Sequence, residues 1–204
     1  MSTQKEETRV RLFDAARKLL VKRGFHSVKL EDIAEEAGVS RQAVYKSHFA
    51  SKAELLLALV QHLHGAEKLD ELTAPYFAAP SGVEMLREAI RSIVLIEGRI
   101  HDIALALTTA AASDAGANAA QSDRLAVKRG AIRGAVERVE AEGHLSSQWS
   151  VDEVTDLLLA LLSVDTYELL VVQSGWRPEQ LIARARDVSE TFLLRRRASR
   201  RGHD

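Results

Sequence analysis

Four polar residues near the start of the chain have side chains that can recognise nucleic acid. These residues follow Ser40 and are Arg41, Gln42, Tyr45 and Lys46. Cationic side chains bind phosphates, and arginine and glutamine can also hydrogen-bond base edges in a major groove. If Ser40 caps a helix, Ala43 and Val44 can face a neighbouring helix while the four polar side chains stay exposed. The pattern predicts a short helix that contacts double-stranded DNA.

Two further helices are needed to position this short helix. The first runs from about Glu7 to Lys22 and ends at Gly24, and the second buries one face at the 3.6-residue period, with Leu30, Ile33, Ala34 and Ala37. Gly38 follows, and a glycine in the left-handed conformation lets the next helix leave at a steep angle. Residues 27–52 are therefore typical of a helix-turn-helix, and we expect Phe25 and Phe49 to fill the core of this three-helix unit.

The composition favours helices throughout the chain. The 204 residues are 46% apolar, contain only three prolines and offer no run of alternating β-branched residues. We therefore predict an all-α protein with one small and one larger domain. The absence of cysteine excludes a disulfide framework, a thiolate zinc site and a cysteine nucleophile.

Charge is distributed unevenly along the chain. The net charge is −1 overall, but residues 1–52 hold 11 basic and 7 acidic side chains, whereas residues 53–194 hold 12 and 21. A basic end on an acidic body can engage phosphate locally without binding nucleic acid over its whole surface. The five arginines within residues 195–201 are interpreted as a solvated helix end, with a second DNA contact as the alternative.

Neither a secretory signal nor a membrane span is expected. The first ten residues, MSTQKEETRV, contain no apolar stretch, and no later segment reaches about 18 uncharged apolar residues. We expect a soluble, cytoplasmic protein that does not associate with membranes.

The rest of the chain is predicted to be helical. Helices are expected over residues 52–72, 83–97, 100–107, 122–142 and 151–172 and from Pro178 onward, with a loop or frayed end at 110–120. Serine followed three residues later by glutamate marks three helix starts, at Ser51, Ser81 and Ser150.

The last two predicted helices carry more apolar residues than one intramolecular face needs. Packed on the same pair from a second chain, they would form a four-helix bundle and a two-fold dimer. The alternative is the ordinary buried core of a monomer. The residues that we assign to a dimer interface are Leu158, Leu162, Leu169, Leu181, Ala185, Val188 and Phe192.

Residues 9–55 resemble the TetR family of bacterial transcriptional regulators. The resemblance lies in a helix that ends in RGF, then LEDIAEEAGVSRQAVY, then HFASKAELL. Tyr45, the His48-Phe49 pair and Lys52 go beyond what a generic helix-turn-helix shares. The later helices match the family only in length and all-helical organisation.

The resemblance implies a division into two domains and a mode of action. Residues 1–52 would be the helix-turn-helix DNA-binding domain, and residues 53–204 a helical ligand-binding and dimerisation domain. The family usually binds a palindromic operator as a homodimer and more often represses than activates. A small-molecule effector in the larger domain would move the helix that begins at Lys52 and so change the spacing of the recognition helices. No cofactor or metal is implied.

Carried over by position, the resemblance places Arg41, Gln42 and Ala43 at the base-facing start of the recognition helix. The other carried-over positions serve as the cap or as base or phosphate contacts, and they are Ser40, Tyr45, Lys46, His48 and Lys52.

The sequence departs from the family pattern at two places. Lys29 replaces the usual threonine or serine cap, which lysine cannot imitate, although it could bind a phosphate. Two residues instead of one separate Tyr45 from His48, so a bulge or an early helix end must absorb the extra residue.

Effector contacts are expected from polar and aromatic residues on the middle helices. Our candidates are His62, Tyr76, Phe77, His101, Thr108 and Tyr167, although each also fits a place in the core or on the surface. Because alanine and leucine dominate around them, we expect a small, mostly apolar effector.

Two other classes of function are the alternatives. An enzyme could use His101 and Asp102 as an acid and base pair, but no third partner and no HExxH, GxSxG or phosphate-loop pattern is present, and no histidine and carboxylate cluster has metal-ligand spacing. We therefore do not expect an enzyme or a metal site. A helical protein-interaction adaptor would explain the apolar segment at 151–172 but would leave the exposed face of Arg41 to Lys46 without a use.

Overall fold

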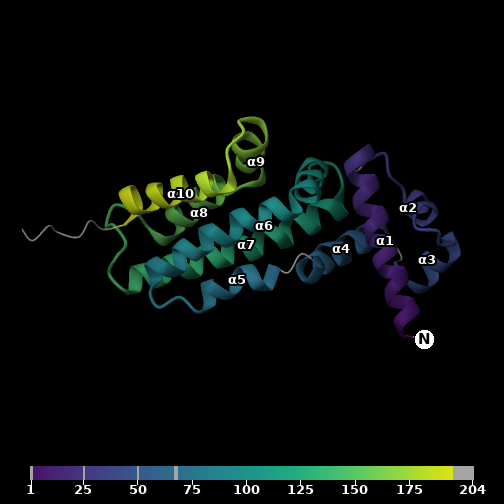
Figure 1. Ribbon diagram of the computed structural model, residues 1–204, viewed down its shortest axis with the longest axis horizontal. Helices are drawn as coiled ribbons and strands as arrows, with labels where there is room; N and C mark the ends of the chain where they lie inside the picture. The colour runs from purple at the N-terminus through teal and green to yellow at the C-terminus, as the bar shows by residue number, and fades with distance from the viewer. Residues whose placement is uncertain (1, 25, 50, 67–68, 195–204) are drawn as a thin grey trace, which may run out of the picture. The chain divides into compact units, whose positions relative to one another are not determined.

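The structure, a computed structural model, describes residues 2–24, 26–49, 51–66 and 69–194 and is helical throughout (Figure 1). Extended pairing in this part of the chain is limited to an isolated bridge between Leu145 and Leu194. The all-α class is therefore confirmed. The helices are α1 (Ser2–Arg23), α2 (Leu30–Glu36), α3 (Arg41–Ser47), α4 (Lys52–Ala66), α5 (Leu69–Phe77), α6 (Gly82–Ala111), α7 (Ala115–Ala141), α8 (Val151–Leu161), α9 (Val164–Tyr167), the π-helix η1 (Glu168–Gln173), α10 (Pro178–Val188) and the π-helix η2 (Ser189–Leu193).

The chain packs into two compact units. Unit 1 comprises residues 1–70 and 99–126, and unit 2 comprises residues 71–98 and 127–204. Helices α6 and α7 each contribute to both units, because the divisions fall after Gly98 and after Ala126. These packing units differ from the functional division after residue 52, which stays a prediction.

Unit 1 is built around α1. This helix packs against α2 and α4, and α2 packs against α3. The core is apolar and nearly closed to solvent, with Leu12, Leu20, Ile33, Val44, Phe49, Leu55, Leu56 and Leu59 buried. Burial of Phe49 confirms its predicted place in the core, whereas Phe25 and the C-terminal arginines lie outside the described residues.

Unit 2 has one continuous core. It joins α5, the first part of α6, the second part of α7, α8, α9 and α10 through Tyr76, Leu86, Ile90, Val94, Ile132, Val136, Val154, Leu158, Leu162, Tyr167, Leu181 and Ala185.

Three predicted helix starts are confirmed by serine caps, since Ser51, Ser81 and Ser150 each accept a hydrogen bond from the N–H of the glutamate three residues later. Pro178 lies at the start of α10 as predicted.

Several predicted boundaries are wrong. Of the helix expected over 52–72, residues 52–66 lie in α4 and residues 69–72 in α5, and residues 67–68 lie outside the described part of the chain. Helix α5 continues through Pro75 to Phe77, where we expected no helix. The interruption expected at Gly98 is present two residues later, since α6 consists of two helical stretches that meet at a kink at Ile100. The segment expected to be a loop or a frayed helix end, 110–120, is mostly the start of α7, because the Asp114 side chain accepts the N–H of Ala117 and the small Ala117 and Ala120 are buried.

The single helix expected over 151–172 is broken. Helix α8 ends at Leu161, and Ser163 caps a new start by accepting the N–H of Thr166. Apolar residues on both sides of the break lie in one core, including Val154, Leu158 and Leu162, whereas Leu157, Leu169 and Val172 stay exposed. This explains much of the apolar surplus without a second chain.

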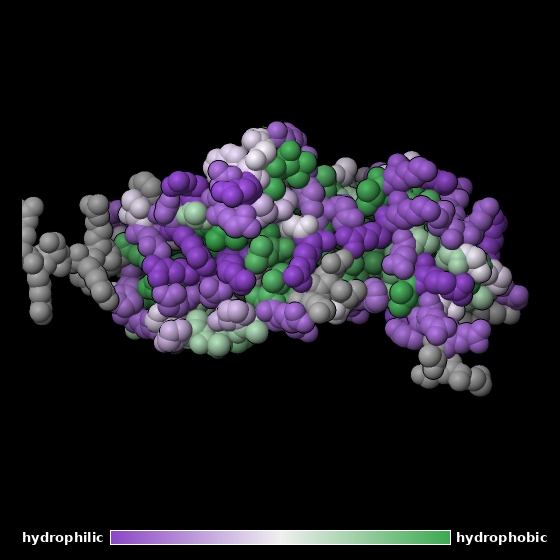
Figure 2. All heavy atoms as spheres, in the orientation of Figure 1, coloured by the Kyte–Doolittle hydropathy of each residue, from purple (hydrophilic) through white to green (hydrophobic). Residues whose placement is uncertain are grey.

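Polar side chains cover most of the face shown in Figure 2, and apolar side chains interrupt them in places. Large apolar residues exposed in unit 2 include Phe77, Leu157, Leu169 and Val172. Among the described residues, no helix combines the length and the apolar character that crossing a membrane requires.

Candidate nucleic-acid interface

The turn between α2 and α3 has the geometry that the sequence predicts. Gly38 has a φ of +65°, which a side chain would strain, and its N–H donates to the Glu35 carbonyl at 3.0 Å. The N–H of Val39 donates to the Ala34 carbonyl at 2.9 Å. The Ser40 side chain then accepts the N–H of Ala43 at 3.2 Å, so the predicted cap of α3 is confirmed.

Helix α3 separates a buried side from an exposed side. Val44 is fully buried, Ala43 is half-buried, and Arg41 and Gln42 are exposed together with Tyr45. The side chain of Lys46 lies outside the described residues. Two donor-bearing side chains at the start of a capped helix can enter a groove without breaking any core contact.

Tyr45 is tied to α2 by a residue that we did not predict. Its hydroxyl donates to Glu31 Oε1 at 2.9 Å, and this hydrogen bond raises the pKa of Tyr45. Backbone hydrogen bonding and the Tyr45 hydroxyl lower the pKa of Glu31, with smaller contributions from Arg41 and Lys29. Glu31 therefore places a carboxylate beside the cationic face, where it would repel phosphates that are not matched by Arg41 or Lys29.

The start of α2 is capped despite the lysine. The backbone N–H of Lys29 donates to Asp32 Oδ2 at 2.8 Å, so a carboxylate within the first turn replaces the missing serine or threonine. The ammonium of Lys29 is exposed and takes no part in the cap. A phosphate contact by Lys29 stays a prediction.

The extra residue before His48 is absorbed by ending α3 early. His48 leaves the helix with φ −127° and ψ −64°, and the N–H groups of His48 and Phe49 both donate to the Val44 carbonyl. Phe49 thereby turns into the core, with its ring centroid 5.7 Å from that of Phe13. Burial, and then the charges of Lys5 and Arg9, lower the pKa of His48, so its ring is neutral near pH 7.

Lys52 already has an acceptor within unit 1. Its Nζ donates to the Val28 carbonyl at 3.2 Å, and burial lowers its pKa. A phosphate held by Lys52, as the resemblance implies, would therefore share the ammonium with this carbonyl.

The six effector candidates fall into both units. In unit 1, the His62 ring centroid lies 4.7 Å from that of Phe13, His101 is half-buried, and Thr108 accepts a hydrogen bond from Gln121 at 2.8 Å. In unit 2, the Tyr76 hydroxyl donates to the Ala131 carbonyl at 3.0 Å, Phe77 is 79% exposed, and Tyr167 is buried. The exposure of Phe77 argues against a place in a pocket wall.

A polar cluster that we did not predict lies in the core of unit 2. Glu97 and Lys128 are 1% and 8% exposed and form an ion pair, and Lys128 Nζ also donates to the Leu162 carbonyl at 3.0 Å. Burial, and then the Glu97 charge, raise the pKa of Tyr167. The sequence could have indicated this cluster. Glu97 lies at helical spacing on the apolar face of Leu86, Ile90 and Ile93, and Lys128 lies on the face of Leu125 and Ile132.

Asp102 is committed to an ion pair. Arg17 of α1 donates to both of its carboxylate oxygens, at 2.8 and 3.0 Å. Both carboxylate oxygens are therefore already hydrogen-bonded to Arg17, which argues against the acid and base pair with His101. Among the described residues, no cluster of three or more histidine, cysteine or carboxylate side chains has the arrangement to hold a metal ion.

The predicted dimer residues are mostly internal. Leu158, Leu162, Leu181 and Ala185 are at most 2% exposed within one chain, so they have no surface to offer a second one. The structure assigns these four to the core, because α8 and α10 turn these faces toward α6 and α7 within the same chain. Leu169 is 56% exposed and Val188 is half-buried, and the Phe192 side chain lies outside the described residues.

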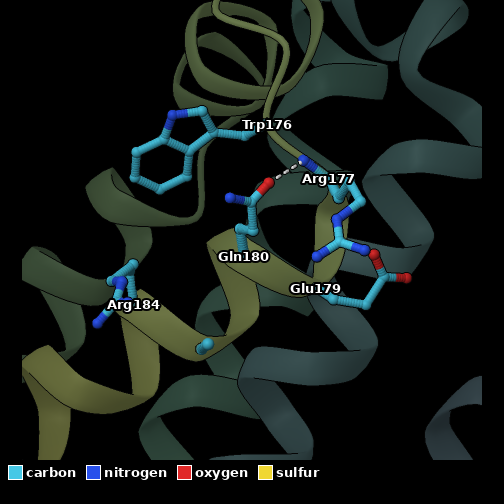
Figure 3. A pocket seen from close by; sticks show the side chains of 6 residues that line it. Trp176, Arg177, Glu179, Gln180 and Arg184 are labelled. Atoms are coloured by element: carbon cyan, nitrogen blue, oxygen red, sulfur yellow. Dashed lines mark hydrogen bonds between the residues drawn. The ribbon is translucent and has the colours of Figure 1, made fainter.

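A surface hollow of about 300 Å³ lies at the start of α10 (Figure 3). Trp176 and Arg184 border it on one side of Gln180, whose Oε1 accepts the N–H of Arg177 at 2.8 Å. Arg184 is paired with Asp187, but both side chains are more than half exposed, so that pair holds the arginine weakly. The hollow thus combines an aromatic wall with adjustable charged side chains.

Comparisons with known proteins agree with this geometry. Residues 12–59 match the family model described as bacterial regulatory proteins, tetR family. Over 59 residues the chain is 49% identical to the HTH-type transcriptional regulator TtgR of Pseudomonas putida, a match that covers 29% of this chain and 28% of the length of that relative.

Solved structures show the same fold over nearly the whole chain. A transcriptional regulator from Saccharomonospora viridis in complex with choline has a TM-score of 0.73 at 21% identity, covering 94% of this chain and 100% of that one. The regulator FadR from Bacillus subtilis in complex with stearoyl-CoA has a TM-score of 0.73 at 16% identity, covering 89% and 97%. At these identities the likeness concerns the fold alone.

Proposed function

The chain belongs to the TetR family of transcriptional regulators, and from this premise we propose that it is a repressor that binds a palindromic DNA operator as a homodimer and is released by a small effector. The observation that carries the proposal is the division of α3. Ser40 caps it and Val44 anchors it, while Arg41 and Gln42 stand exposed. The family assignment is also the reason to set the enzyme alternative aside.

The DNA contacts are proposed from α3 and its surroundings. Arg41 and Gln42 would contact bases, and bidentate contacts to guanine and adenine would discriminate by about 1–3 kcal/mol each. Tyr45, Lys29 and Lys52 would bind phosphates, with Lys46 and His48 as further contacts and Ala43 facing the groove. His48 would act as a neutral hydrogen-bond partner because its pKa is lowered.

Selection of bound duplexes from random DNA by the purified full-length chain tests this proposal. We expect an inverted repeat with half-sites about one helical turn apart, since each protomer would present one α3. Binding should weaken steeply with salt, because lysine and arginine contacts release counterions from the phosphates. Failure to enrich an inverted repeat even at low salt would contradict the proposal.

A dimer requires a different interface from the one that we first assigned. We propose that a second copy covers the exposed apolar side chains of unit 2, with Leu169 and Val172 of η1 as its centre and Leu157 of α8 as a further contact. These side chains are uncharged and between 40% and 56% exposed, which is costly for a monomer in water.

Analytical ultracentrifugation of Leu169→Glu tests the interface. The substituted carboxylate faces water in the monomer but would be buried in the dimer, so we expect dissociation without loss of helix content. Val127→Glu is a matched control, because Val127 is also exposed but lies on α7. An unchanged dimer in Leu169→Glu would place the interface elsewhere.

We propose a small, mostly apolar effector with one polar group. Choline and stearoyl-CoA, the ligands of the two structural relatives, differ widely in polarity, so the choice rests on the residues of this chain. The core of unit 2 is apolar except for the cluster of Glu97, Lys128 and Tyr167, which could match one polar group. Thermal-shift screening of apolar compounds with and without such a group tests the proposal, and stabilisation only by highly charged compounds would contradict it.

A further inference from the structure

Glu31 of α2 places a carboxylate beside the side chains that are proposed to meet DNA. Its Oε1 accepts the hydroxyl proton of Tyr45 at 2.9 Å, and Tyr45 is 46% exposed. Tyr45 follows Arg41 by four residues, so the two side chains are neighbours on the exposed side of α3. The charges of Arg41 and Lys29 also act on Glu31. Glu31 therefore lies among three of the proposed DNA contacts.

Two other acidic residues of α2 have different tasks. Asp32 caps the helix, because its Oδ2 accepts the N–H of Lys29 at 2.8 Å. Glu36 forms an ion pair with Lys18 of α1. Glu31 instead bonds a side chain of the recognition helix itself. Its position relative to α3 is thus fixed by a contact that neither the cap nor the packing against α1 requires.

The chemistry of a carboxylate restricts which base can lie opposite Glu31. Hydrogen bonds from its own backbone and from Tyr45, and then the Arg41 charge, lower the pKa of Glu31, so it is ionised near pH 7 and can only accept hydrogen bonds. In the major groove guanine presents O6 and N7 and thymine presents O4, and these acceptors repel a carboxylate. Adenine presents an amino group beside the acceptor N7, whereas cytosine presents its N4 amino group without a neighbouring acceptor. Cytosine is therefore the base that matches Glu31 best.

We propose that Glu31 is a specificity-determining residue that selects cytosine at one position of each half-site by accepting a hydrogen bond from the N4 amino group. The inference rests on the proposed function and assigns one position of the operator to α2. Tyr45 is the positioning residue. A carboxylate can accept several hydrogen bonds, so Tyr45 and the base can share it, and a phosphate that takes the Tyr45 proton leaves Glu31 dependent on the base alone. Guanine or thymine at this position sets two acceptors against each other, which rejects the wrong sequence.

Competition binding of the full-length chain tests the proposal. The probes are the duplex found by the operator selection and duplexes in which each cytosine is replaced, in both half-sites, by each of the other three bases. For the unmodified protein we expect one cytosine position at which replacement weakens binding by about 5- to 150-fold. In Glu31→Ala the four bases at this position should bind within about twofold of one another, because the selecting acceptor is gone. A cytosine that pairs with a guanine read by Arg41 keeps its effect in Glu31→Ala, so the two contacts are told apart.

Two further substitutions separate a contact with the base from a general effect of charge. Glu31→Gln should move the preference from cytosine to adenine, since a glutamine side chain can bond both N6 and N7 of adenine. Tyr45→Phe keeps the ring but cannot donate to Glu31, so its preference for cytosine should lie between those of the unmodified protein and Glu31→Ala. Each preference compares duplexes bound by the same variant, and a partial loss of folded protein therefore cancels.

Glu36→Gln is the matched control. It also removes one negative charge from α2, but from a carboxylate that is paired with Lys18. It should change the affinity for all duplexes alike and leave every base preference intact.

The inference is overturned if Glu31→Ala keeps the preference of the unmodified protein at every cytosine, or if it changes the affinity for all duplexes by the same factor. A selected operator that tolerates replacement of every cytosine would also overturn it. If no duplex is selected at all, the proposed function itself has failed.

Discussion

The helix-turn-helix carries its polar groups on the outside, whereas unit 2 carries a charged pair in its core. Arg41 and Gln42 are exposed, and the buried residues described beneath them carry no charge. Glu97 and Lys128 are enclosed by apolar residues, and the charge of each is neutralised by the other. Exposed groups can change with evolution at little cost in stability, while buried ones cannot be changed singly. Recognition and stability are therefore separable in the first region and linked in the second.

The largest effect is expected from separating the buried pair. Lys128→Met leaves the Glu97 carboxylate buried without its counterion, and we expect the free energy of unfolding to fall by about 3–5 kcal/mol. Denaturant unfolding measures the loss. The double variant Glu97→Met with Lys128→Met should recover most of it, because two apolar side chains then fill the space. Equal losses in the single and double variants would show that the pair is not coupled.

Changing the exposed face of α3 should affect binding and leave stability almost unchanged. Arg41→Ala and Gln42→Ala should each weaken binding to the selected duplex by about 1–3 kcal/mol. Their free energies of unfolding should stay within about 0.5 kcal/mol of the unmodified protein. Fluorescence anisotropy and denaturant unfolding provide the two measurements. A large loss of stability in either variant would contradict the separation between the two regions.

Replacing one glycine in each region by alanine should change stability in opposite directions, because the two glycines have different backbone conformations. Gly38→Ala should destabilise by about 1–2 kcal/mol, because its φ of +65° strains a side chain. Gly130→Ala should stabilise by about 0.5–1 kcal/mol, since Gly130 lies within α7 and a Cβ there meets no atom within 4 Å. Thermal unfolding of both variants checks the opposite signs. Destabilisation by both would mean that α7 is packed more tightly at this position.

The smallest effect is a dependence of stability on pH. Burial lowers the pKa of His48 in the folded state, so the unfolded chain binds this proton more readily. The contribution of His48 is fully present above the unfolded pKa of about 6.5 and is lost as the pH falls below it. We expect denaturant unfolding of His48→Gln to vary less with pH between about 7 and 5 than that of the unmodified protein. Identical pH profiles would assign the dependence to other groups.

Local sequence signals were reliable where one residue determines one conformation. Gly38, the caps at Ser40 and Ser150 and the proline at the start of α10 were all predicted and confirmed. Signals that depend on which face of a long helix a residue occupies were not reliable. The break at Leu162 and Ser163 divides the helix that the apolar pattern predicted over 151–172, and a single serine does not reveal it because serine occurs within helices as well as at their starts.

The amino-acid sequence by itself determined the all-α class and the three-helix unit with its helix-turn-helix, because caps, turns and apolar periodicity act within a few residues along the chain. The tertiary structure decided which charges meet. Arg17 and Asp102 are 85 residues apart, and Lys128 and Glu97 are 31 apart. Such pairs depend on how whole helices pack, and no local pattern specifies the partner of a buried charge.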